Sequence, residues 1–558
     1  MPRDFHVPQT IESMPPEDLI VWKKPRFKWL IVFYIAIALQ AVAAIFIAPK
    51  VTSYETYESV LEDESTVSFV IFYVLIPLTL LMTLIWWTFL SGVPGRMRVG
   101  GVLIFFVALV GTVFGLVRID GFEGDMKPIF AWRWSPRAEE VAAEAKKQQV
   151  AADANLLAGR ELIIVEEDWP EFRNDHREGV VPNLQLNRDF AANPPEELWR
   201  HPVGLGWSSF SIVDDLCWTQ EQVYENELVV CYELKTGMQV WVHEDETRWS
   251  EPYGGDGPRA TPTIHEGHAY SLGGTGILNC LNALSGEKIW SRNILEDAGA
   301  KNISWAMSAS PLIVDQMVIV NPGTGETKRT EQGKGVIAYD KLTGEILWAK
   351  GDYPASYAGV RLAELHGEKQ LILFDGHGVA GIAPADGTEL WRFEWENMPQ
   401  VNAAQPIVRE NRILISSSYN RGSALLEIGH TGDNWSVEPL WAKNNFFKLK
   451  FNDGVEKDGF VYGLDESLMS CIELESGKRQ WKARSNTGFG QVILIGDILT
   501  ILCESGEVAF AEATPEKWNE LYRMPVLDGK TWNTPAFSRG YLLLRNGQEA
   551  VCLKLAVQ

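Results

Sequence analysis

The chain has 558 residues, of which 46% are hydrophobic and 22% charged, and its formal net charge is −23 at pH 7. This composition is that of a folded protein and excludes wholesale disorder. The acidic balance lacks the basic footprint of a nucleic-acid-binding protein, so that class is excluded as well. No CxxC pair occurs, which leaves zinc-finger and thioredoxin-type sites without their spacing. The six cysteines are Cys217, Cys231, Cys280, Cys471, Cys503 and Cys552.

Three apolar stretches near the N-terminus predict transmembrane helices at residues 27–48, 67–90 and 99–117. Buried core helices are the alternative, but core helices rarely run this long without a polar face. Basic residues precede the first stretch, and acidic residues dominate the loop after it. The positive-inside rule therefore makes residues 1–26 a cytoplasmic tail. We expect an integral protein of a bacterial inner membrane, with a cytoplasmic N-terminus and a periplasmic C-terminal domain.

Residues 118–168 are expected to form a helical linker. Within this range, the segment that starts at Ser135 is rich in Ala, Glu, Lys and Gln, which are strong helix formers. Ser135 suits the N-cap, and Pro136 suits the first helical position. The apolar stripe of this helix is weak, so a spacer is favoured over a coiled coil.

From about residue 160 the sequence consists of short β-rich runs, and one phrase recurs: a Gly, three residues, then a Trp. The copies are Gly237/Trp241, Gly286/Trp290, Gly344/Trp348, Gly387/Trp391 and Gly477/Trp481. A turn-forming residue precedes each Gly. Each copy therefore predicts a strand, a tight turn and a second strand that carries the Trp.

Degenerate copies end at Trp441 and near Tyr522, and the last copy lacks its final strand. An isolated strand with Trp199 supplies that strand, so the units close into a ring. The prediction is an all-β eight-bladed propeller of four-stranded blades over residues 169–558. Closure leaves no exposed sheet edge. The expected structural inter-blade tryptophans are Trp199, Trp241, Trp290, Trp348, Trp391, Trp441 and Trp481.

Six residues before each repeated Gly stands a small residue, namely Cys231, Cys280, Ala338, Gly381 or Cys471. The shared demand is for little volume rather than for a thiol. We therefore interpret these three cysteines as small core residues. Disulfides stay open for Cys217, Cys503 and Cys552, because an oxidising compartment permits them.

The phrases "LNALSGEKIW" and "IAYDKLTGEILW" resemble the repeat of pyrroloquinoline-quinone-type (PQQ-like) propellers. "DWPEFRNDHREG", residues 168–179, is similar to a lead-in common upstream of such propellers. The resemblance implies that each Trp docks between adjacent blades. It also implies two functional branches. One holds quinoprotein dehydrogenases, which bind the quinone and Ca²⁺ at the propeller axis, and the other holds cofactor-free scaffolds similar to the barrel-assembly lipoprotein.

The dehydrogenase branch needs an oxygen cage for Ca²⁺ and an Asp base. No Ca²⁺ ligand carries over residue by residue, and the adjacent-Cys pair of many alcohol dehydrogenases is absent. We therefore assign no catalytic residue and no metal ligand. The favoured function is a binding or scaffolding module for envelope assembly, a protein or a small ligand. The alternative is a PQQ- and Ca²⁺-dependent dehydrogenase that passes electrons to membrane quinone.

Polar segments that do not repeat lie between the expected strands, and in a propeller such segments converge on one axial face. Ordinary solvated loops are the favoured interpretation. As a binding mouth they contribute Trp, Arg, acid and amide side chains suited to a small ligand. The candidate residues are Glu221, Asp256, Arg259, Trp305, Asn402, Gln405, Trp532 and Asn533.

Overall fold

The computed structural model describes residues 76–90, 92, 94–148, 159–324 and 333–558. The chain divides into two compact units, Met1–Ser135 and Pro136–Gln558. In the first unit, α5 (Ile76–Ile85) leads into a π-helical turn (Trp86–Leu90), and α6 (Gly95–Gly115) is followed by a hairpin of β1 (Val117–Phe122) and β2 (Pro128–Trp132). The Trp87 indole N–H donates to the Arg98 carbonyl at 3.0 Å, which ties the π-helical turn to α6.

The expected membrane topology needs correction. Among the residues that the structure describes, no helix is both long enough and apolar enough to cross a membrane. This finding contradicts the predicted integral inner-membrane protein with three spans. The stretch 27–48 lies outside the described residues, as does the beginning of 67–90. In the described remainder of 67–90, α5 and the π-helical turn follow one another from Ile76 to Leu90.

The linker expected to be helical over 118–168 is mixed. Its described residues hold most of the β1–β2 hairpin and one helix, α7 (Ala138–Gln148), which belongs to the second unit. Pro136 lies two residues before α7, and Glu139 and Glu140 occupy its first turn with Lys146 and Lys147 in its last. This charge order complements the helix dipole.

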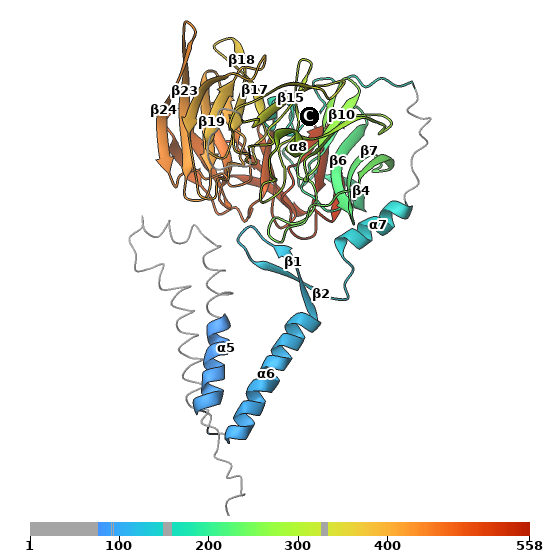
Figure 1. Ribbon diagram of the computed structural model, residues 1–558, viewed down its shortest axis with the longest axis vertical. Helices are drawn as coiled ribbons and strands as arrows, with labels where there is room; N and C mark the ends of the chain where they lie inside the picture. Colours follow the sequence, from blue (N-terminus) through green and yellow to red (C-terminus); the bar gives the residue numbers. More distant parts are fainter. Residues whose placement is uncertain (1–75, 91, 93, 149–158, 325–332) are drawn as a thin grey trace, which may run out of the picture. The chain divides into compact units, whose positions relative to one another are not determined.

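The second unit contains eight sheets that form the blades of a propeller, as predicted (Figure 1). Blade 1 contains β5 (Ser211–Val213), β6 (Leu216–Val223), β7 (Asn226–Glu233) and β8 (Gln239–Asp245). Blade 2 contains β9 (Thr263–His265), β10 (His268–Leu272), β11 (Ile277–Asn282) and β12 (Lys288–Asn293). Helix α8 (Ile294–Ala298) follows blade 2.

The next three blades follow the same order. Blade 3 is β13 (Leu312–Val314), β14 (Met317–Val320), β15 (Val336–Asp340) and β16 (Ile346–Lys350). Blade 4 is β17 (Arg361–Leu365), β18 (Glu368–Phe374), β19 (Gly378–Ile382) and β20 (Glu389–Glu394). Blade 5 is β21 (Ile407–Arg409), β22 (Arg412–Ser417), β23 (Gly422–Thr431) and β24 (Asn434–Asn444).

Blades 6 to 8 complete the ring. Blade 6 is β25 (Val455–Lys457), β26 (Phe460–Asp465), β27 (Leu468–Glu473) and β28 (Lys478–Lys482). Blade 7 is β29 (Gln491–Ile495), β30 (Ile498–Leu502), β31 (Glu507–Glu512) and β32 (Glu520–Pro525), with β3 (Val180–Val181) added beside β29. Blade 8 is β33 (Ala536–Ser538), β34 (Tyr541–Arg545), β35 (Glu549–Lys554) and the early strand β4 (Glu196–Pro202).

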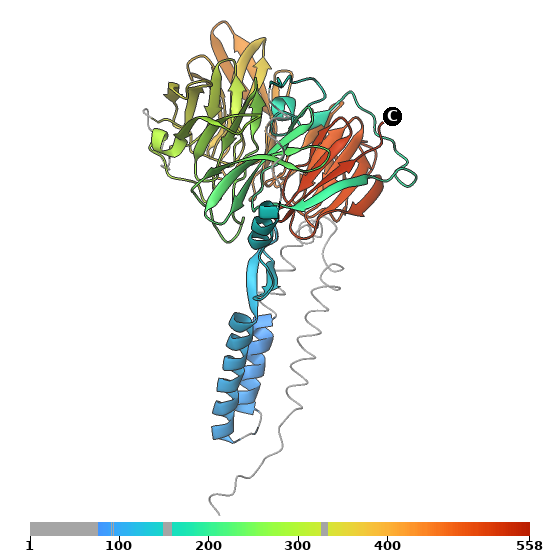
Figure 2. The ribbon, with the colours of Figure 1, turned by 90° about the vertical axis from the view of Figure 1, so that its right-hand side faces the viewer.

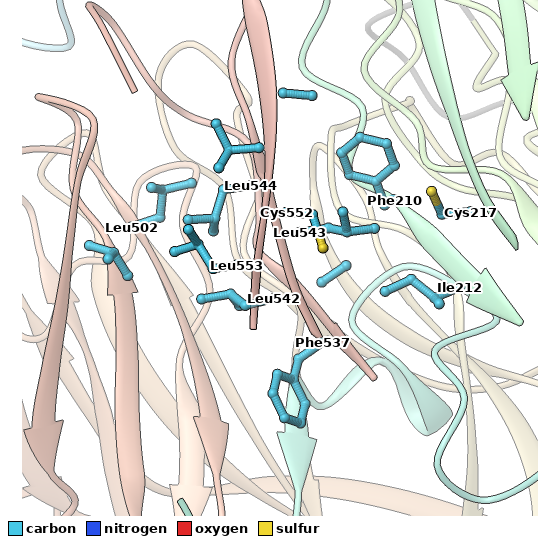
Figure 3. Close-up of a cluster of buried hydrophobic side chains, with 14 of the residues drawn as sticks. Phe210, Ile212, Cys217, Leu502, Phe537, Leu542, Leu543, Leu544, Cys552 and Leu553 are labelled. Carbon is cyan, nitrogen blue, oxygen red and sulfur yellow. The ribbon is translucent and has the colours of Figure 1, made fainter. Parts of the chain in front are cut away.

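Ring closure occurs where β4 pairs with β35, which places Trp199 opposite Cys552. The early strand therefore completes the last blade, as predicted from Trp199 (Figure 2). A buried apolar cluster spans this seam and joins Phe210 and Ile212 of the first blade's side to Leu543 of the last (Figure 3). Burial of such side chains contributes about 1.5–3 kcal/mol each, which holds the closure together.

A small residue stands opposite the repeated Trp in most blades. The pairs are Cys231/Trp241, Cys280/Trp290, Ala338/Trp348, Gly381/Trp391, Cys471/Trp481 and Cys552/Trp199. A register shift follows immediately after each pair, so the bulge recurs at one position. All six cysteines are free thiols in the buried core. Cys552, left open on sequence, thus joins the small-residue series.

The repeated Trp side chains link neighbouring blades through hydrogen bonds. Six of them donate an indole N–H to a carbonyl at or before the hairpin turn of the next blade, at 2.8–3.0 Å; they are Trp199, Trp241, Trp290, Trp348, Trp441 and Trp481. Trp391 differs, because it donates to Gln370 Oε1 of its own blade. The hairpin of blade 5 that would receive Trp391 is the long β23–β24 pair.

Candidate functional site

The connections of an antiparallel four-stranded blade alternate between its two ends. The link from the fourth strand of one blade to the first strand of the next therefore lies at the same end as the turn between the second and third strands. We call this side of the ring the loop face. The repeated Gly turns join the third and fourth strands, so they lie on the opposite side, the turn face.

Of the aromatic side chains in between-blade segments of the loop face, six stand two to seven residues before the first strand of a blade, and we call these six the aromatic rim. Each precedes the first strand of a blade by a few residues, so the ring positions all six on one side. Five are half-buried, and Phe489 is 5% exposed. The aromatic rim consists of Trp207, Trp305, Tyr357, Phe451, Phe489 and Trp532.

Four members of the aromatic rim contact one another. The ring centroids of Trp207 and Trp532 are 5.1 Å apart, those of Phe451 and Trp532 4.8 Å, and those of Phe451 and Phe489 5.8 Å. Phe451 and Trp532 precede blades 6 and 8, so their contact bypasses blade 7. Such a contact requires both rings to point toward the axis, where the blades converge.

Two lysines lie over these aromatic rings. Lys530 Nζ is 4.1 Å from the ring centroid of Trp532, and Lys450 Nζ is 4.3 Å from that of Phe489. Both distances are within the range of a cation–π interaction. Glu504 accepts the Trp532 indole N–H at 2.8 Å. The aromatic cluster is thus bordered by cations and one carboxylate.

A second cluster surrounds Arg259. Trp305 and Tyr357 lie with ring centroids 5.6 Å apart, and the Trp305 backbone N–H donates to the Tyr357 hydroxyl at 3.2 Å. The Arg259 Nη2 atom lies 3.4 Å from Glu251 Oε1. Burial lowers the pKa of Arg259 to about 10, so the guanidinium stays charged at neutral pH. The same burial raises the pKa of Tyr357, which therefore remains a neutral phenol.

The structure places the sequence-predicted residues in different surroundings. Arg259, Trp305 and Trp532 lie in the two clusters just described. Asp256 accepts from Arg248 at 2.7 Å and from Ser250 at 2.8 Å, so its carboxylate is engaged within its own loop.

Glu221 is fully buried at the seam between blades 8 and 1. Its carboxylate accepts from the Gly204 backbone N–H at 2.7 Å and from the Tyr232 hydroxyl at 2.5 Å. Lys146 of α7 lies 3.0 Å from it. Burial would raise the pKa of Glu221, but Lys146 and Arg545 outweigh it and hold this pKa at about 2.

The three predicted amides are buried in the propeller. Asn402 donates to the carbonyls of Asp375 and Trp395 and accepts from Ser417 at 2.5 Å, so it joins blades 4 and 5. Gln405, with its amide oriented to satisfy both groups, bonds the Gly359 backbone N–H at 2.7 Å and carbonyl at 3.0 Å. Asn533 donates to the Ser208 carbonyl at 2.8 Å. Their contacts are those of structural side chains.

Sequence reasoning missed the role of residues 168–181, which we call the axial segment. The Trp169 backbone pairs with Ile212 of β5, and the Pro170 carbonyl accepts from Ile264 of β9 at 2.8 Å. Val180 and Val181 pair with β29. Since these are first strands, which pack against each other around the ring, the axial segment lies inside it.

Two buried arginines extend these contacts to further blades. Arg173 donates to the carbonyls of Val492 at 2.8 Å and Gly454 at 2.9 Å. Arg177 donates to the carbonyls of Ser310 at 2.9 Å and Pro311 at 3.0 Å. Burial lowers the pKa of both guanidinium groups. The sequence feature that could have indicated this role is the four-residue spacing of the two arginines in "FRNDHREG". That spacing does not identify the carbonyl groups to which they donate.

Other residues of the loop face were also missed on sequence, among them Trp207, Tyr357 and Lys450. They stand in between-blade segments, as Arg259, Trp305 and Trp532 do, so segment position was the available signal. A quinone with Ca²⁺ would need a cage of hard oxygen ligands. Among the described residues, no group of three or more His, Cys, Asp or Glu side chains is arranged to hold a metal. The rim as described does not supply that cage.

The comparisons with known proteins agree with the architecture. A family model described as "Outer membrane protein assembly factor BamB" matches residues 225–483. The quinohemoprotein alcohol dehydrogenase of Comamonas testosteroni is 13% identical, with a TM-score of 0.52 over 75% of this chain and 84% of that chain. No curated protein sequence matches this chain.

A second solved structure is similar to the same degree. The quinohemoprotein alcohol dehydrogenase ADHIIG from Pseudomonas putida HK5 is 13% identical, with a TM-score of 0.50 over 70% of this chain and 80% of that chain. At this identity the likeness shows the fold alone. Together with the family match, it shows that the chain carries a PQQ-like eight-bladed β-propeller.

Proposed function

We propose that this protein is a binding module that holds a partner protein on the loop face of its propeller, across the aromatic rim. The observation that carries this proposal is the gathering of six aromatic side chains with Arg259, Lys450 and Lys530 on one face. Aromatic and Arg side chains are the residues most enriched at the centres of protein interfaces. The matched family, described as an assembly factor, supports the same kind of function.

The distribution of charge on the chain restricts the kind of partner that fits the loop face. The protein carries a net charge of −23, yet cations border the aromatic rim. A partner segment that combines apolar side chains with carboxylates complements this surface. The same segment is repelled by the rest of the protein, because the rest of the protein is acidic.

The test uses the full-length chain with a photo-crosslinking amino acid in place of Tyr357. The matched control carries it in place of Leu342, which is 51% exposed on a hairpin turn of the turn face. We expect one partner crosslinked from position 357 and none from 342. Affinity for that purified partner should then fall at least about tenfold in Trp305→Ala and Trp532→Ala, and stay unchanged in Leu342→Ala. Equal crosslinking from both positions would overturn the proposal.

The second candidate is a dehydrogenase that uses PQQ and Ca²⁺, and the fold shared with quinohemoprotein alcohol dehydrogenases favours it. Titration of the full-length protein with both compounds separates the two functions. One quinone bound per chain, with reduction of an artificial dye in the presence of alcohols or sugars, would replace the binding-module proposal. Absence of quinone binding would rule out the dehydrogenase function.

A further inference from the structure

Blades 1 and 2 meet through polar side chains in a part of their interface. On blade 1, Gln222 lies directly opposite Glu227, and Glu227 lies directly opposite Asp245. Directly opposed residues of antiparallel strands project to the same side of the sheet. Asp245 is four residues from Trp241 on β8, so both project to the side on which Trp241 meets blade 2. The three polar side chains therefore face blade 2.

Blade 2 also places polar side chains in this part of the interface. Asn279 lies opposite Ser271, and the Asn279 amide donates to Asp245 Oδ2 at 2.6 Å. Ser271 is fully buried, Asn279 is 1% exposed and Glu227 is 4% exposed. The interface therefore holds a buried row of oxygen-bearing side chains from both blades.

Among the described residues, no cation lies at hydrogen-bond distance from Glu227. Its Oε1 accepts from the Gly274 backbone N–H at 3.1 Å, and its Oε2 lies against Gly273, where even a Cβ would collide with it. Burial raises the pKa of Glu227 to about 7. Asp245 adds to the effect, while the backbone N–H groups of Gly274 and Thr275 and the charge of Arg259 oppose it. Asp245 in turn faces His243 Nε2 at 3.4 Å.

Three oxygens of this row have no hydrogen-bond donor among the described residues. They are Glu227 Oε2, Asn279 Oδ1 and Ser271 Oγ, and the Gln222 Nε2 donor opposite Glu227 has no acceptor either among these residues. Buried polar atoms in native proteins nearly always have a hydrogen-bonding partner, so we expect each of these three oxygens to have a binding partner as well. The Asn279 amide orientation is set by its bond to Asp245, which leaves its oxygen and not its nitrogen unpartnered.

We propose that Glu227, Asp245, Asn279 and Ser271 form a site for a divalent cation of the Ca²⁺ type, held between blades 1 and 2. Carboxylate, amide and hydroxyl oxygens are the ligands that Ca²⁺ takes, with water or a backbone carbonyl completing its shell. The ion adds a link between two blades that are already joined here by the Asn279–Asp245 and Gly274–Glu227 hydrogen bonds. The site is separate from the aromatic rim and independent of the binding function proposed above.

The site has two carboxylates and two neutral oxygen ligands, so it is not a cluster of three acidic, His or Cys side chains. Both acids come from blade 1 and both neutral ligands from blade 2. An ion can bind there only when the two blades are packed against each other, so ion binding is coupled to folding of the ring.

The experiment titrates the metal-free full-length protein with Tb³⁺ and then with Ca²⁺. Trp249 lies beside the site, because its backbone N–H donates to Gln222 Oε1 at 2.8 Å, and it is a suitable sensitiser of Tb³⁺ luminescence. We expect one Tb³⁺ per chain, displaced by Ca²⁺, and a Ca²⁺-dependent rise in the melting temperature. In Glu227→Gln the affinity should fall by at least about tenfold. Glu225→Gln, the same charge change at an exposed residue two positions away, should bind as the original chain does.

A second variant keeps the test decisive if Glu227→Gln folds poorly. Asn279→Asp adds a third carboxylate, so it should lower the melting temperature without metal and show a larger rise with Ca²⁺. Equal affinity of Glu227→Gln and the original chain would overturn the site. So would the absence of Tb³⁺ and Ca²⁺ effects on the original chain, which would assign the unpartnered oxygens to buried water.

Discussion

Lys146 Nζ lies 3.0 Å from Glu221 Oε2 and thereby joins helix α7 to the seam at which the ring closes. The same ammonium also lies 3.1 Å from the Tyr232 hydroxyl. At the other end of α7, Glu139 accepts from Arg248 at 2.6 Å. Helix α7 is therefore held to the propeller at both ends, beside β4 and β6 (Figure 1). It contributes to the stability of the seam.

Replacing Lys146 by Ala should destabilise the propeller by about 1–3 kcal/mol, because the buried Glu221 carboxylate loses one of its two cations. Chemical unfolding at pH 7 measures the change. Lys147→Ala is the control, since the Lys147 side chain is 72% exposed and pairs only with Glu144 across 3.6 Å. A loss in Lys147→Ala as large as in Lys146→Ala would show that helix propensity, and not the buried pair, is responsible.

Replacing Gly344 by Ala should cost more than an ordinary glycine replacement. Gly344 has a φ of 71°, and an added Cβ would lie 2.8 Å from the Trp290 ring. Gly367 has a φ of 81° with no atom near its Cβ position, so Gly367→Ala carries the backbone strain alone. We expect about 1 kcal/mol for Gly367→Ala and about 2–4 kcal/mol for Gly344→Ala. Similar losses in both would mean that the Trp docking adds nothing.

Removing the Arg173 side chain should loosen the axial segment. Arg173→Ala leaves the carbonyls of Val492 and Gly454 without their donor in a buried place, and we expect a loss of about 2–4 kcal/mol. Arg188→Ala is the control, because its side chain is 48% exposed, and should cost less than about 1 kcal/mol. Thermal unfolding compares the two. An Arg173→Ala melting temperature equal to that of Arg188→Ala would contradict the role of the axial segment.

Glu227 should make the protein less stable as the pH rises. Its pKa is raised from 4.5 to about 7 in the folded chain, so the folded state binds the proton more tightly than the unfolded state. Stability is therefore fully present below about pH 4.5 and falls by about 2–3 kcal/mol as the pH passes 7. Of the charged groups around it, Asp245 acts in the same direction and Arg259 in the opposite one.

In a metal chelator, Glu227→Gln should accordingly be more stable than the original chain at pH 8 and should lose this advantage at pH 5. Unfolding at the two pH values provides the measurement, with Glu225→Gln as the control. An advantage of Glu227→Gln that is the same at both pH values would rule out titration of this carboxyl as its cause.

The recurring Gly and Trp predicted the blades because they encode local geometry. A Gly at positive φ and a Trp four residues later specify a hairpin and its docking, whatever surrounds them. Trp391 shows the limit of that reasoning, since its partner depends on the length of the next blade's hairpin.

The candidate site was predictable only in part. Arg259, Trp305 and Trp532 were predicted from their position in non-repeating segments, and the structure places them on the loop face. Asn402 and Asn533 stand in similar segments but are buried in structural contacts, and Glu221 lies within β6. A polar side chain at a strand end points either to the axis or to a neighbouring blade. Which of the two directions the side chain takes depends on the blades packed beside it. The sequence between two strands does not contain that information.

The sequence by itself determined the number of blades, the hairpin turns, the place of the small residues opposite Trp and the closure of the ring by Trp199. These features depend on contacts within one blade or on a repeated contact between neighbours. Only the tertiary structure decided which residues meet across the axis, how residues 168–181 fill the ring, and how Glu227 and Asn279 come to share one interface. Those contacts join distant parts of the chain, and the curvature of the closed ring is what brings them together.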